Sequence, residues 1–200
     1  MEPDRLFHIY NRGNNSQTVF FRREDYTAFL VKIRKHLNPH LDILAYCLMP
    51  NHFHLMVHSK EAMDISRYKQ DLRMMLSSYT RKINFRTKRT GSLFQQNSKT
   101  KPLEAKDYAF ICFHYIHQNP LIAQPVTEIE DWEFGSYRDY AGFRNGTLCN
   151  KEMAYQLLDI PKKQRSFHRA VENGDRSLKS EKLLFMTITF KLLTALALFH

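Results

Sequence analysis

The sequence predicts an α+β fold of the ferredoxin-like (RRM-like) kind, in which helices pack on an antiparallel sheet. Two observations support this prediction. Apolar residues change between strand-like and helical spacing in the order strand, helix, strand, strand, helix, strand, helix. The second and third strand-like runs are separated only by Pro50-Asn51, which predicts a hairpin. Hairpin strands with helices between the pairs are typical of this fold class.

The first half of the chain supplies three strands and one helix. Residues 6–10 read as the first strand, residues 11–15 as a turn, and residues 18–21 as a short apolar piece. Apolar residues then recur at helical spacing from Tyr26 to Leu37, and Asn38-Pro39 ends that helix. Residues 41–49 and 52–58 form the two strands of the hairpin.

The second half supplies two long helices and one more strand. An apolar stripe from Ile65 to Ile83 predicts the second helix, followed by a loop over residues 85–91. We expect residues 93–103 to form the fourth strand. Residues 104–118 should form the third helix, ended by Asn119-Pro120. A loop with the only tryptophan, Trp132, and a short helix at residues 151–158 follow.

We expect one domain over residues 1–160 and a tail of unknown role over residues 161–200. The tail begins with a polar linker and ends in an apolar segment, residues 183–199. That segment is at the lower limit of length for a membrane span, and Lys191 near its centre is costly in lipid. We therefore favour a packing or dimer helix and expect no membrane partner.

The N-terminus and the cysteines indicate the compartment. The first five residues contain no apolar run, so we expect no secretory signal. Three cysteines, an odd number and far apart, exclude a disulfide scaffold and a CxxC zinc module. The sequence thus predicts a cytoplasmic protein.

Positive charge is concentrated in one stretch of the chain. The formal net charge is +10, and residues 67–106 alone hold eleven basic residues against two acidic ones. The remainder is nearly neutral. A solvated helix surface would explain scattered lysines, but clustering of this kind favours a phosphate backbone as partner. The candidate contacts in this stretch are Arg73, Arg81, Lys82, Arg86, Lys88, Arg89 and Lys99.

Two histidines on the third predicted strand are candidate metal ligands. Alternate residues of a strand face the same side, so His52 and His54 point away from the side that Phe53 faces. Two imidazoles at this spacing can lean onto one ion, and imidazole binds Zn, Mn, Fe, Ni or Cu. Taken alone, however, the pair is better explained as an ordinary exposed face, because short motifs match by chance.

The third predicted helix carries a second candidate group. Tyr115 and Asn119 are four residues apart and lie on one helix face, so a phenol and an amide oxygen can reach one site. The plainer alternatives are a packing tyrosine and an asparagine that only ends the helix. His114 and His117 then read as surface residues.

Several motifs in order resemble one known family. They are YNRGN (residues 10–14), MPNHFHLMV (49–57), GSLFQ (91–95), YIHQNP (115–120) and WEFGSYRDY (132–140). Together they resemble the REP-associated tyrosine transposases, a branch of the HUH single-tyrosine (IS200-like) transposases. The resemblance runs from about Leu6 to Tyr140. The ordered set is far more specific than either candidate pair, and it favours the functional interpretation of both.

The resemblance implies a set of roles. Tyr115 matches the nucleophilic tyrosine, and His52, His54 and Asn119 match the residues that bind a divalent ion, Mg²⁺ or Mn²⁺. The implied activity is cleavage and joining of single-stranded or hairpin DNA at repeats, through a 5′-phosphotyrosine. Arg12, in the first turn, is a further candidate DNA contact or else a solvent-exposed arginine. The resemblance also implies a bacterial, nucleoid-associated monomer or homodimer.

Two departures from the family keep other functions open. Gln96-Asn97-Ser98 stands where an arginine and an aromatic are usual, and the segment around Trp132 is looser than the usual W-S-S-Y. One alternative is a domesticated protein that binds hairpin DNA or RNA without cutting it. Another is a metal hydrolase that uses water, with Tyr115 in a structural role.

Overall fold

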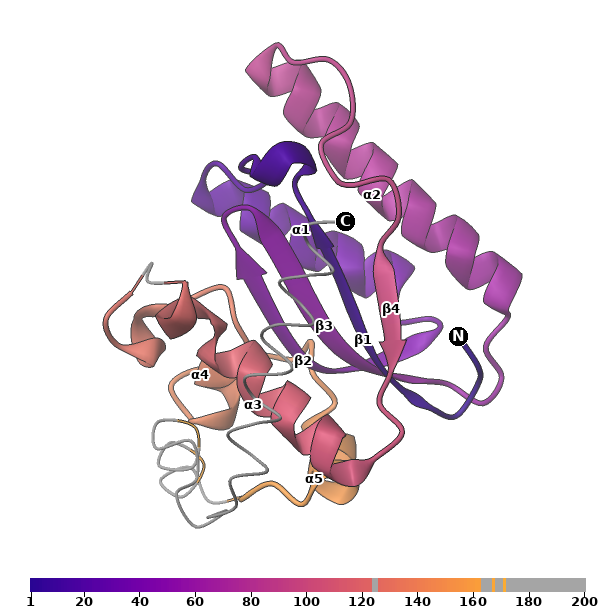
Figure 1. The fold of residues 1–200 in the computed structure, drawn as a ribbon, viewed down its shortest axis with the longest axis vertical. Coiled ribbons are helices and arrows are strands. Elements are labelled where there is room, and N and C mark those ends of the chain that lie inside the picture. The colour runs from indigo at the N-terminus through magenta and orange to yellow at the C-terminus, as the bar shows by residue number, and fades with distance from the viewer. Residues whose placement is uncertain (124–125, 163–166, 168–170, 172–200) are drawn as a thin grey trace.

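The computed structural model describes residues 1–123, 126–162, 167 and 171, and Figure 1 shows their arrangement. The elements in this part are β1 (Leu6–Arg12), α1 (Arg23–His36), β2 (Leu41–Met49), β3 (His52–Ser59), α2 (Ile65–Thr87), β4 (Lys99–Pro102), α3 (Lys106–Ile122), α4 (Tyr137–Tyr140) and α5 (Lys151–Leu158). Single turns of 3-10 helix occur at Asn14–Ser16 and Ile129–Asp131. Most of the predicted linker and the whole apolar segment 183–199 lie outside the described residues.

The sheet has the strand order of the predicted fold class. Its four strands are ordered β2-β3-β1-β4, and the three pairings are all antiparallel. The segments that contain α1 and α2 each connect strands that are not neighbours in the sheet. This is the ferredoxin-like topology, so the predicted α+β class is confirmed. β3, which carries the two candidate histidines, is an inner strand between β2 and β1.

Helices α1 and α2 cover one face of the sheet with an aromatic core (Figure 1). The ring of Phe29 on α1 lies 5.2 Å from that of Phe53 on β3 and 4.9 Å from that of Tyr79 on α2, measured between centroids. Phe20 contacts the same group. Burial of large rings stabilises this layer strongly. It therefore fixes β3, which carries His52 and His54, through the sheet face opposite these histidines.

Helix α3 covers the opposite face of the sheet, next to β2 and β3 (Figure 1). Ten of its residues are buried, which fits a helix whose sequence is apolar on nearly all sides. Its outer side contacts the segment after it, because the ring of Phe113 lies 5.1 Å from that of Tyr140 and 6.1 Å from that of Phe167. The candidate catalytic helix is therefore fixed on both sides.

Three predicted boundaries were wrong. The fourth strand covers only Lys99–Pro102, because residues 93–98 turn back to contact β1 and its following loop. Helix α2 continues to Thr87, so part of the predicted loop 85–91 is helical. Helix α3 passes through Pro120 and ends at Ile122. Proline lacks a backbone N–H, so the helix gives up one hydrogen bond at Pro120 and ends two residues later.

The side-chain prediction for two histidines on α3 was also wrong. His114 and His117 are buried instead of lying on the surface. His117 Nε2 lies 2.8 Å from Ser136 Oγ, which donates to the carbonyl oxygen of Tyr46 in β2. Burial lowers the pKa of His117 to about 3, with help from the positive charge that His114 can carry. This neutral histidine thus belongs to the packing between α3, α4 and β2.

An ion pair joins the start of α1 to the end of α2 on the aromatic face. Asp25 on α1 is fully buried and accepts hydrogen bonds from the backbone N–H groups of Phe21 and Arg22. Arg86 near the end of α2 binds the same carboxylate through both guanidinium nitrogens, one of them at 2.7 Å. A bidentate arginine–carboxylate pair combines two charge-assisted hydrogen bonds, which are stronger than neutral ones. The pair therefore ties α2 to α1.

Two structural features relate to the predicted compartment: the state of the cysteines and the apolar character of the helices. Cys47, Cys112 and Cys149 are buried free thiols. Among the described residues, no helix combines the length and the apolar character that a membrane crossing requires.

Candidate active site

The two histidines of β3 lie on the sheet face that α3 covers. His52 is half-buried and His54 is almost completely buried. Their ring centroids are 5.0 Å apart. The prediction that they share a face opposite Phe53 is therefore correct, but this face is covered by a helix instead of being open to solvent.

Helix α3 brings the other two candidates, Tyr115 and Asn119, to the same place. The ring of Tyr115 meets that of His54 edge to face, with centroids 5.5 Å apart. Asn119 Oδ1 lies 3.1 Å from His52 Nε2. The four side chains that the sequence singled out therefore lie together in the fold. They come from two elements that are far apart in the chain.

The donors and acceptors around His52 fit a cation. Its Nδ1 lies 2.7 Å from Asn51 Oδ1, and its Nε2 faces Asn119 Oδ1. A neutral imidazole has only one N–H, so one nitrogen presents a lone pair to an amide oxygen in this arrangement. A metal ion between Nε2 and Asn119 Oδ1 would turn both atoms into ligands. Rotation of the Asn119 amide, which would place its N–H group opposite His52 Nε2, is the competing arrangement.

The fit for a metal extends to His54. Its Nε2 is buried and makes no hydrogen bond with any described residue. Such an atom is costly unless something occupies the space in front of it. Within the described part of the chain no three His, Cys, Asp or Glu side chains cluster as a metal site. The candidate site consists of two imidazoles and one amide oxygen, which suits a divalent ion that also binds substrate oxygens.

Burial keeps the imidazoles of this site neutral. It lowers the pKa of His52 to about 4, against the hydrogen bond with Asn119, while Arg12 adds to the lowering. Burial also lowers the pKa of His54 well below its usual value, and His52 and His8 contribute. Neutral imidazole is the form that binds metal ions, so the site is ready for one at neutral pH.

Two of the sequence motifs, residues 10–14 and 91–95, meet near the loop between β2 and β3. The backbone N–H of Gly13 donates to the carbonyl oxygen of Asn51 at 2.7 Å, and that of Asn14 donates to Leu93. Asn11 donates to the Ser98 hydroxyl at 3.0 Å. A side chain at Gly13 would collide with the backbone of Gln17, so only glycine fits there. These contacts fix the position of His52 at the start of β3.

The segment around Trp132 supports the site from the other edge of the sheet. Gly135 forms a bridge with Cys47, and Leu48 donates to the carbonyl oxygen of Phe134. Ser136 accepts a hydrogen bond from the Tyr46 backbone at 2.9 Å. This short segment extends the sheet beyond β2.

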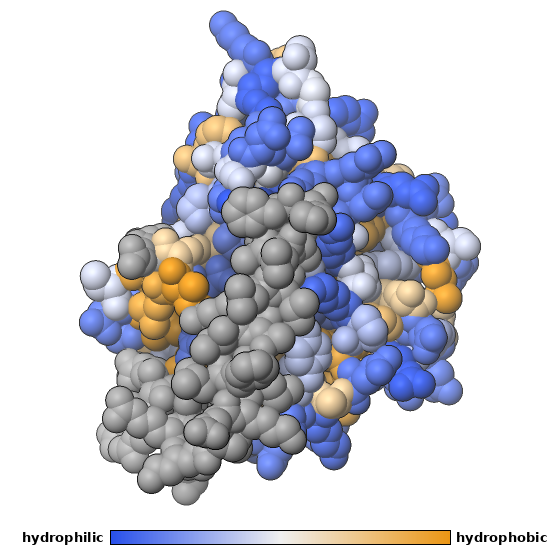
Figure 2. Space-filling view, viewed as in Figure 1, coloured by the Kyte–Doolittle hydropathy of each residue, from blue (hydrophilic) through white to orange (hydrophobic). Residues whose placement is uncertain are grey.

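The predicted DNA contacts divide into two groups. Arg12 lies at the end of β1, opposite His52, and Lys99 lies on β4 opposite Tyr10, so both are close to the site in the sheet register. Arg73, Arg81, Lys82 and Lys88 are exposed on α2 and at its end. Hydrophilic residues dominate this side of the molecule, toward the top and right of Figure 2.

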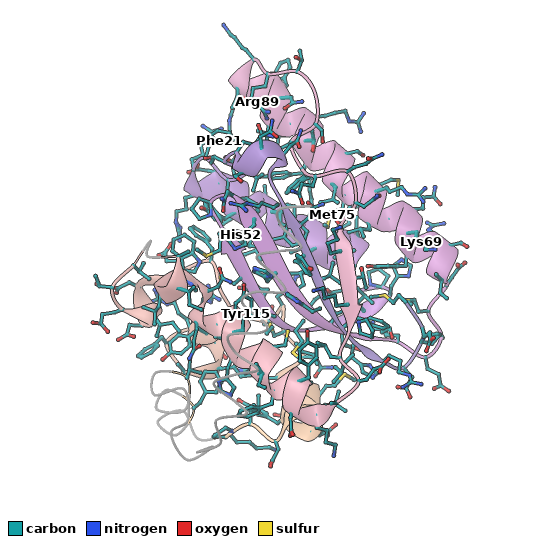
Figure 3. All side chains as sticks on the ribbon, viewed as in Figure 1. Phe21, His52, Lys69, Met75, Arg89 and Tyr115 are labelled. Atoms are coloured by element: carbon teal, nitrogen blue, oxygen red, sulfur yellow. The ribbon has the colours of Figure 1, made fainter. Side chains whose placement is uncertain are left out.

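Two of the predicted contacts have partners within the protein. The Arg86 guanidinium binds the buried carboxylate of Asp25, which gives it a structural role. Arg89 binds the side-chain oxygens of Gln17 and Asn84. Both are less available to a ligand than the sequence suggested. Figure 3 shows Arg89 near the end of α2, away from His52 and Tyr115.

Three residues of the site were missed by the sequence argument. His8 and Tyr10 on β1 and Lys101 on β4 lie on the same sheet face as His54. His8 Nε2 is 2.9 Å from His54 Nδ1, and the ammonium of Lys101 lies 5.8 Å from the ring centroid of Tyr10. The polar residues at alternate positions 8, 10 and 12 of the first strand were the available signal.

Similarity to known proteins identifies the family of this chain. The model of the family described as transposase IS200-like matches residues 5–119, more than half of the chain and all four candidate residues. The chain belongs to this family. The IS200-like resemblance that the motifs indicated is thereby confirmed, and with it a transposase-type function.

A solved structure shares the fold of this IS200-like protein. It is that of a REP-associated tyrosine transposase bound to a REP hairpin, with a TM-score of 0.55 at 18% sequence identity. The alignment covers 71% of this chain and 81% of that chain. A search of the curated proteins finds no match.

Proposed function

We propose that this protein is a metal-dependent enzyme that nicks and joins single-stranded DNA at hairpins or repeats, as a member of the REP-associated branch. One observation carries the proposal: Tyr115 lies edge-on to His54 while His52 faces Asn119 Oδ1. A nucleophile and a candidate cation site therefore share one position. The hairpin in the similar solved structure supports a hairpin substrate.

The reaction is a transesterification. Tyr115 Oη attacks the phosphorus of a phosphodiester and gives up its proton. The bond from phosphorus to the 3′ oxygen breaks, and that oxygen leaves as a 3′-hydroxyl after taking up a proton. The product is a 5′-phosphotyrosine, which keeps the ester energy, so a 3′-hydroxyl can later attack it and rejoin the strands.

The chain would hold Mg²⁺ or Mn²⁺ through His52, His54 and Asn119. When bound, the ion would withdraw charge from the non-bridging phosphate oxygens. The remaining work falls to the protein. Helix α3, buried on both sides, holds Tyr115 at a fixed position over His54, and fixed orientation of the nucleophile lowers the barrier to attack.

The DNA backbone would meet cations on two parts of the fold. Arg12 and Lys99 would hold phosphates beside the site, and the exposed residues of α2 would hold a hairpin stem. Arg86 is left out of this set because Asp25 occupies its guanidinium.

The charge argument predicts a change in salt dependence. Replacing Arg81 and Lys82 together by alanine should weaken hairpin binding and reduce the slope of log K against log salt concentration by roughly 2, because each phosphate contact contributes about 0.9. Fluorescence anisotropy at several salt concentrations measures this slope. Replacing Arg34 and Lys35, basic neighbours on α1, is the matched control and should leave the slope unchanged. An unaltered slope in the Arg81 and Lys82 variant would remove α2 from the interface.

The test of the proposed function is a covalent-adduct assay. Labelled single-stranded DNA with hairpins from beside the gene is mixed with the protein and Mn²⁺, and the products are separated on a denaturing protein gel. The proposal expects a labelled band at protein mass that disappears with EDTA. A native-gel shift without any covalent band, across several sequences and metals, would indicate the alternative: a non-cleaving binder of hairpin DNA or RNA. The departure at Gln96-Asn97-Ser98 favours that alternative, although Ser98 retains a hydrogen bond to Asn11.

A further inference from the structure

His8 is a buried histidine that makes one close polar contact with the candidate metal site. It is fully buried on β1, and its Nε2 lies 2.9 Å from Nδ1 of His54. The two rings stack with centroids 5.0 Å apart and planes at 22°. His8 also stacks on Tyr10, with centroids 4.7 Å apart, so two neighbouring rings restrict its rotation.

This contact decides which nitrogen of His54 carries a proton. The two nitrogens that face each other share one proton. If it resides on His54 Nδ1, this N–H donates to His8 and His54 Nε2 carries a lone pair. If it resides on His8, then His54 Nε2 must carry the second proton of a neutral ring pair, and it cannot bind a metal ion.

A metal ion at His54 Nε2 would favour the first arrangement. Burial alone does not choose, because the second arrangement places an N–H on the buried His54 Nε2 and the first places one on the buried His8 Nδ1. A cation at the position that the proposed function gives it needs the lone pair of His54 Nε2. The proton then lies on His54 Nδ1, where His8 Nε2 is close enough to accept it.

We propose that His8 is a positioning residue: it accepts the Nδ1–H of His54 and so directs the Nε2 lone pair toward the metal ion. The inference rests on the proposed function, because it assumes the metal site of His52, His54 and Asn119. His8 does not touch the DNA or the ion in this scheme. It acts through the tautomer and the ring orientation of His54, as outer partners of metal-binding histidines do.

The test compares three chains by Mn²⁺ titration calorimetry without DNA. His8→Leu removes the acceptor and should weaken Mn²⁺ binding by roughly 10- to 100-fold. His8→Gln places an amide oxygen near the position of Nε2 and should restore most of the affinity. Nitrogen-15 NMR of the wild-type protein with Mg²⁺ adds a second readout: we expect His54 protonated at Nδ1 and bare at Nε2.

Each outcome decides something. Equal Mn²⁺ affinity in wild type and His8→Leu, or a His54 proton on Nε2, would overturn the inference while leaving the proposed function intact. If wild type binds no Mn²⁺, or if its Mn²⁺ binding is unchanged in His52→Ala, the metal part of the proposed function fails. The inference then fails with it. Should His8→Leu not fold, His8→Gln and the NMR tautomer still give the answer.

A second and independent feature is an aromatic ring exposed among cations. Phe85 near the end of α2 is 90% exposed, the most exposed of the large hydrophobic side chains in the described residues. Arg81 and Lys82 lie one helical turn before it, and Lys88 follows at the end of the helix. A ring this exposed contributes little to the core, and its cationic neighbours complement phosphate.

We infer that Phe85 stacks on an unpaired base of the bound hairpin while the neighbouring cations hold its backbone. Aromatic rings interleaved with positive charge are typical of single-strand binding surfaces, since each base presents a face for stacking. This inference also rests on the proposed function, and it specifies which part of the DNA meets the end of α2.

Two variants test the stacking. Phe85→Ala should weaken hairpin binding by roughly 5- to 150-fold, the range that loss of one base stack gives, without changing the salt slope. Phe85→Trp should keep binding and show fluorescence quenching when DNA is added. Phe143→Ala, at another exposed phenylalanine, is the matched control. Unchanged affinity in Phe85→Ala, or no quenching in Phe85→Trp, would overturn the inference; absence of hairpin binding by wild type would instead contradict the proposed function.

Discussion

Tyr115→Phe should abolish the covalent protein–DNA adduct and reduce strand cleavage by on the order of 10³-fold or more, as loss of a covalent nucleophile does in other enzymes. The phenyl ring keeps the edge-to-face contact with His54, so the fold and the candidate metal site stay in place. Only the attacking oxygen is lost. Cleavage and adduct are measured on denaturing gels with a labelled hairpin substrate.

The matched control is Tyr108→Phe on the same helix. Tyr108 lies two turns before Tyr115, and both phenols act on the pKa of Tyr10, which burial raises to about 12. It is therefore a phenol near the site with no assigned role, and its loss should leave the adduct intact. Cleavage that persists in Tyr115→Phe without an adduct would instead support a hydrolase that uses water.

The second large effect concerns stability. Asp25→Ala should lower the free energy of unfolding by about 3–5 kcal/mol, because it leaves the Arg86 guanidinium, which is largely buried, without its counter-charge. It also removes the acceptor for the N–H groups of Phe21 and Arg22. Urea denaturation measures the difference. Glu24→Ala is the control: this neighbour forms only an exposed pair with Arg22 and should change stability by less than about 1 kcal/mol.

The same ion pair predicts a pH dependence. Burial alone would raise the pKa of Asp25, but hydrogen bonds from Arg86 and the backbone of Phe21 and Arg22 outweigh it and hold the pKa below its usual value. A carboxyl whose pKa is lower in the folded state stabilises the fold above its unfolded pKa. The difference in stability between wild type and Asp25→Ala should therefore shrink as the pH falls below about 4. A constant difference down to pH 2 would contradict this assignment.

The sequence predicted the first three strands and singled out the four candidate residues because their signals are local. Alternation along β3 placed His52 and His54 on one face, and a spacing of four placed Tyr115 and Asn119 on one side of α3. Family resemblance then joined the two pairs, which the structure brings within contact distance. No local pattern could do this, since the two pairs are more than sixty residues apart.

The errors arose where tertiary contacts override local patterns. The prediction of Arg86 as a DNA contact is untested, but charge counting does not show the carboxylate of Asp25, which lies in another helix and binds this guanidinium. His117 was placed on the surface because the pattern does not show that α4 and Ser136 cover it. His8 was missed because its partner, His54, lies across the sheet on a strand distant in sequence.

The most direct test of the account is to locate the covalent bond by mass spectrometry. Wild-type protein is incubated with hairpin DNA and Mn²⁺, the DNA is trimmed with nuclease, and the tryptic peptide of residues 107–138 is sequenced. This peptide contains Tyr108, Tyr115 and Tyr137, so fragmentation distinguishes the three phenols. The account predicts a 5′-phosphonucleotide on Tyr115 that requires Mn²⁺. The same modification on another residue, or cleaved DNA without any modified peptide, would contradict it.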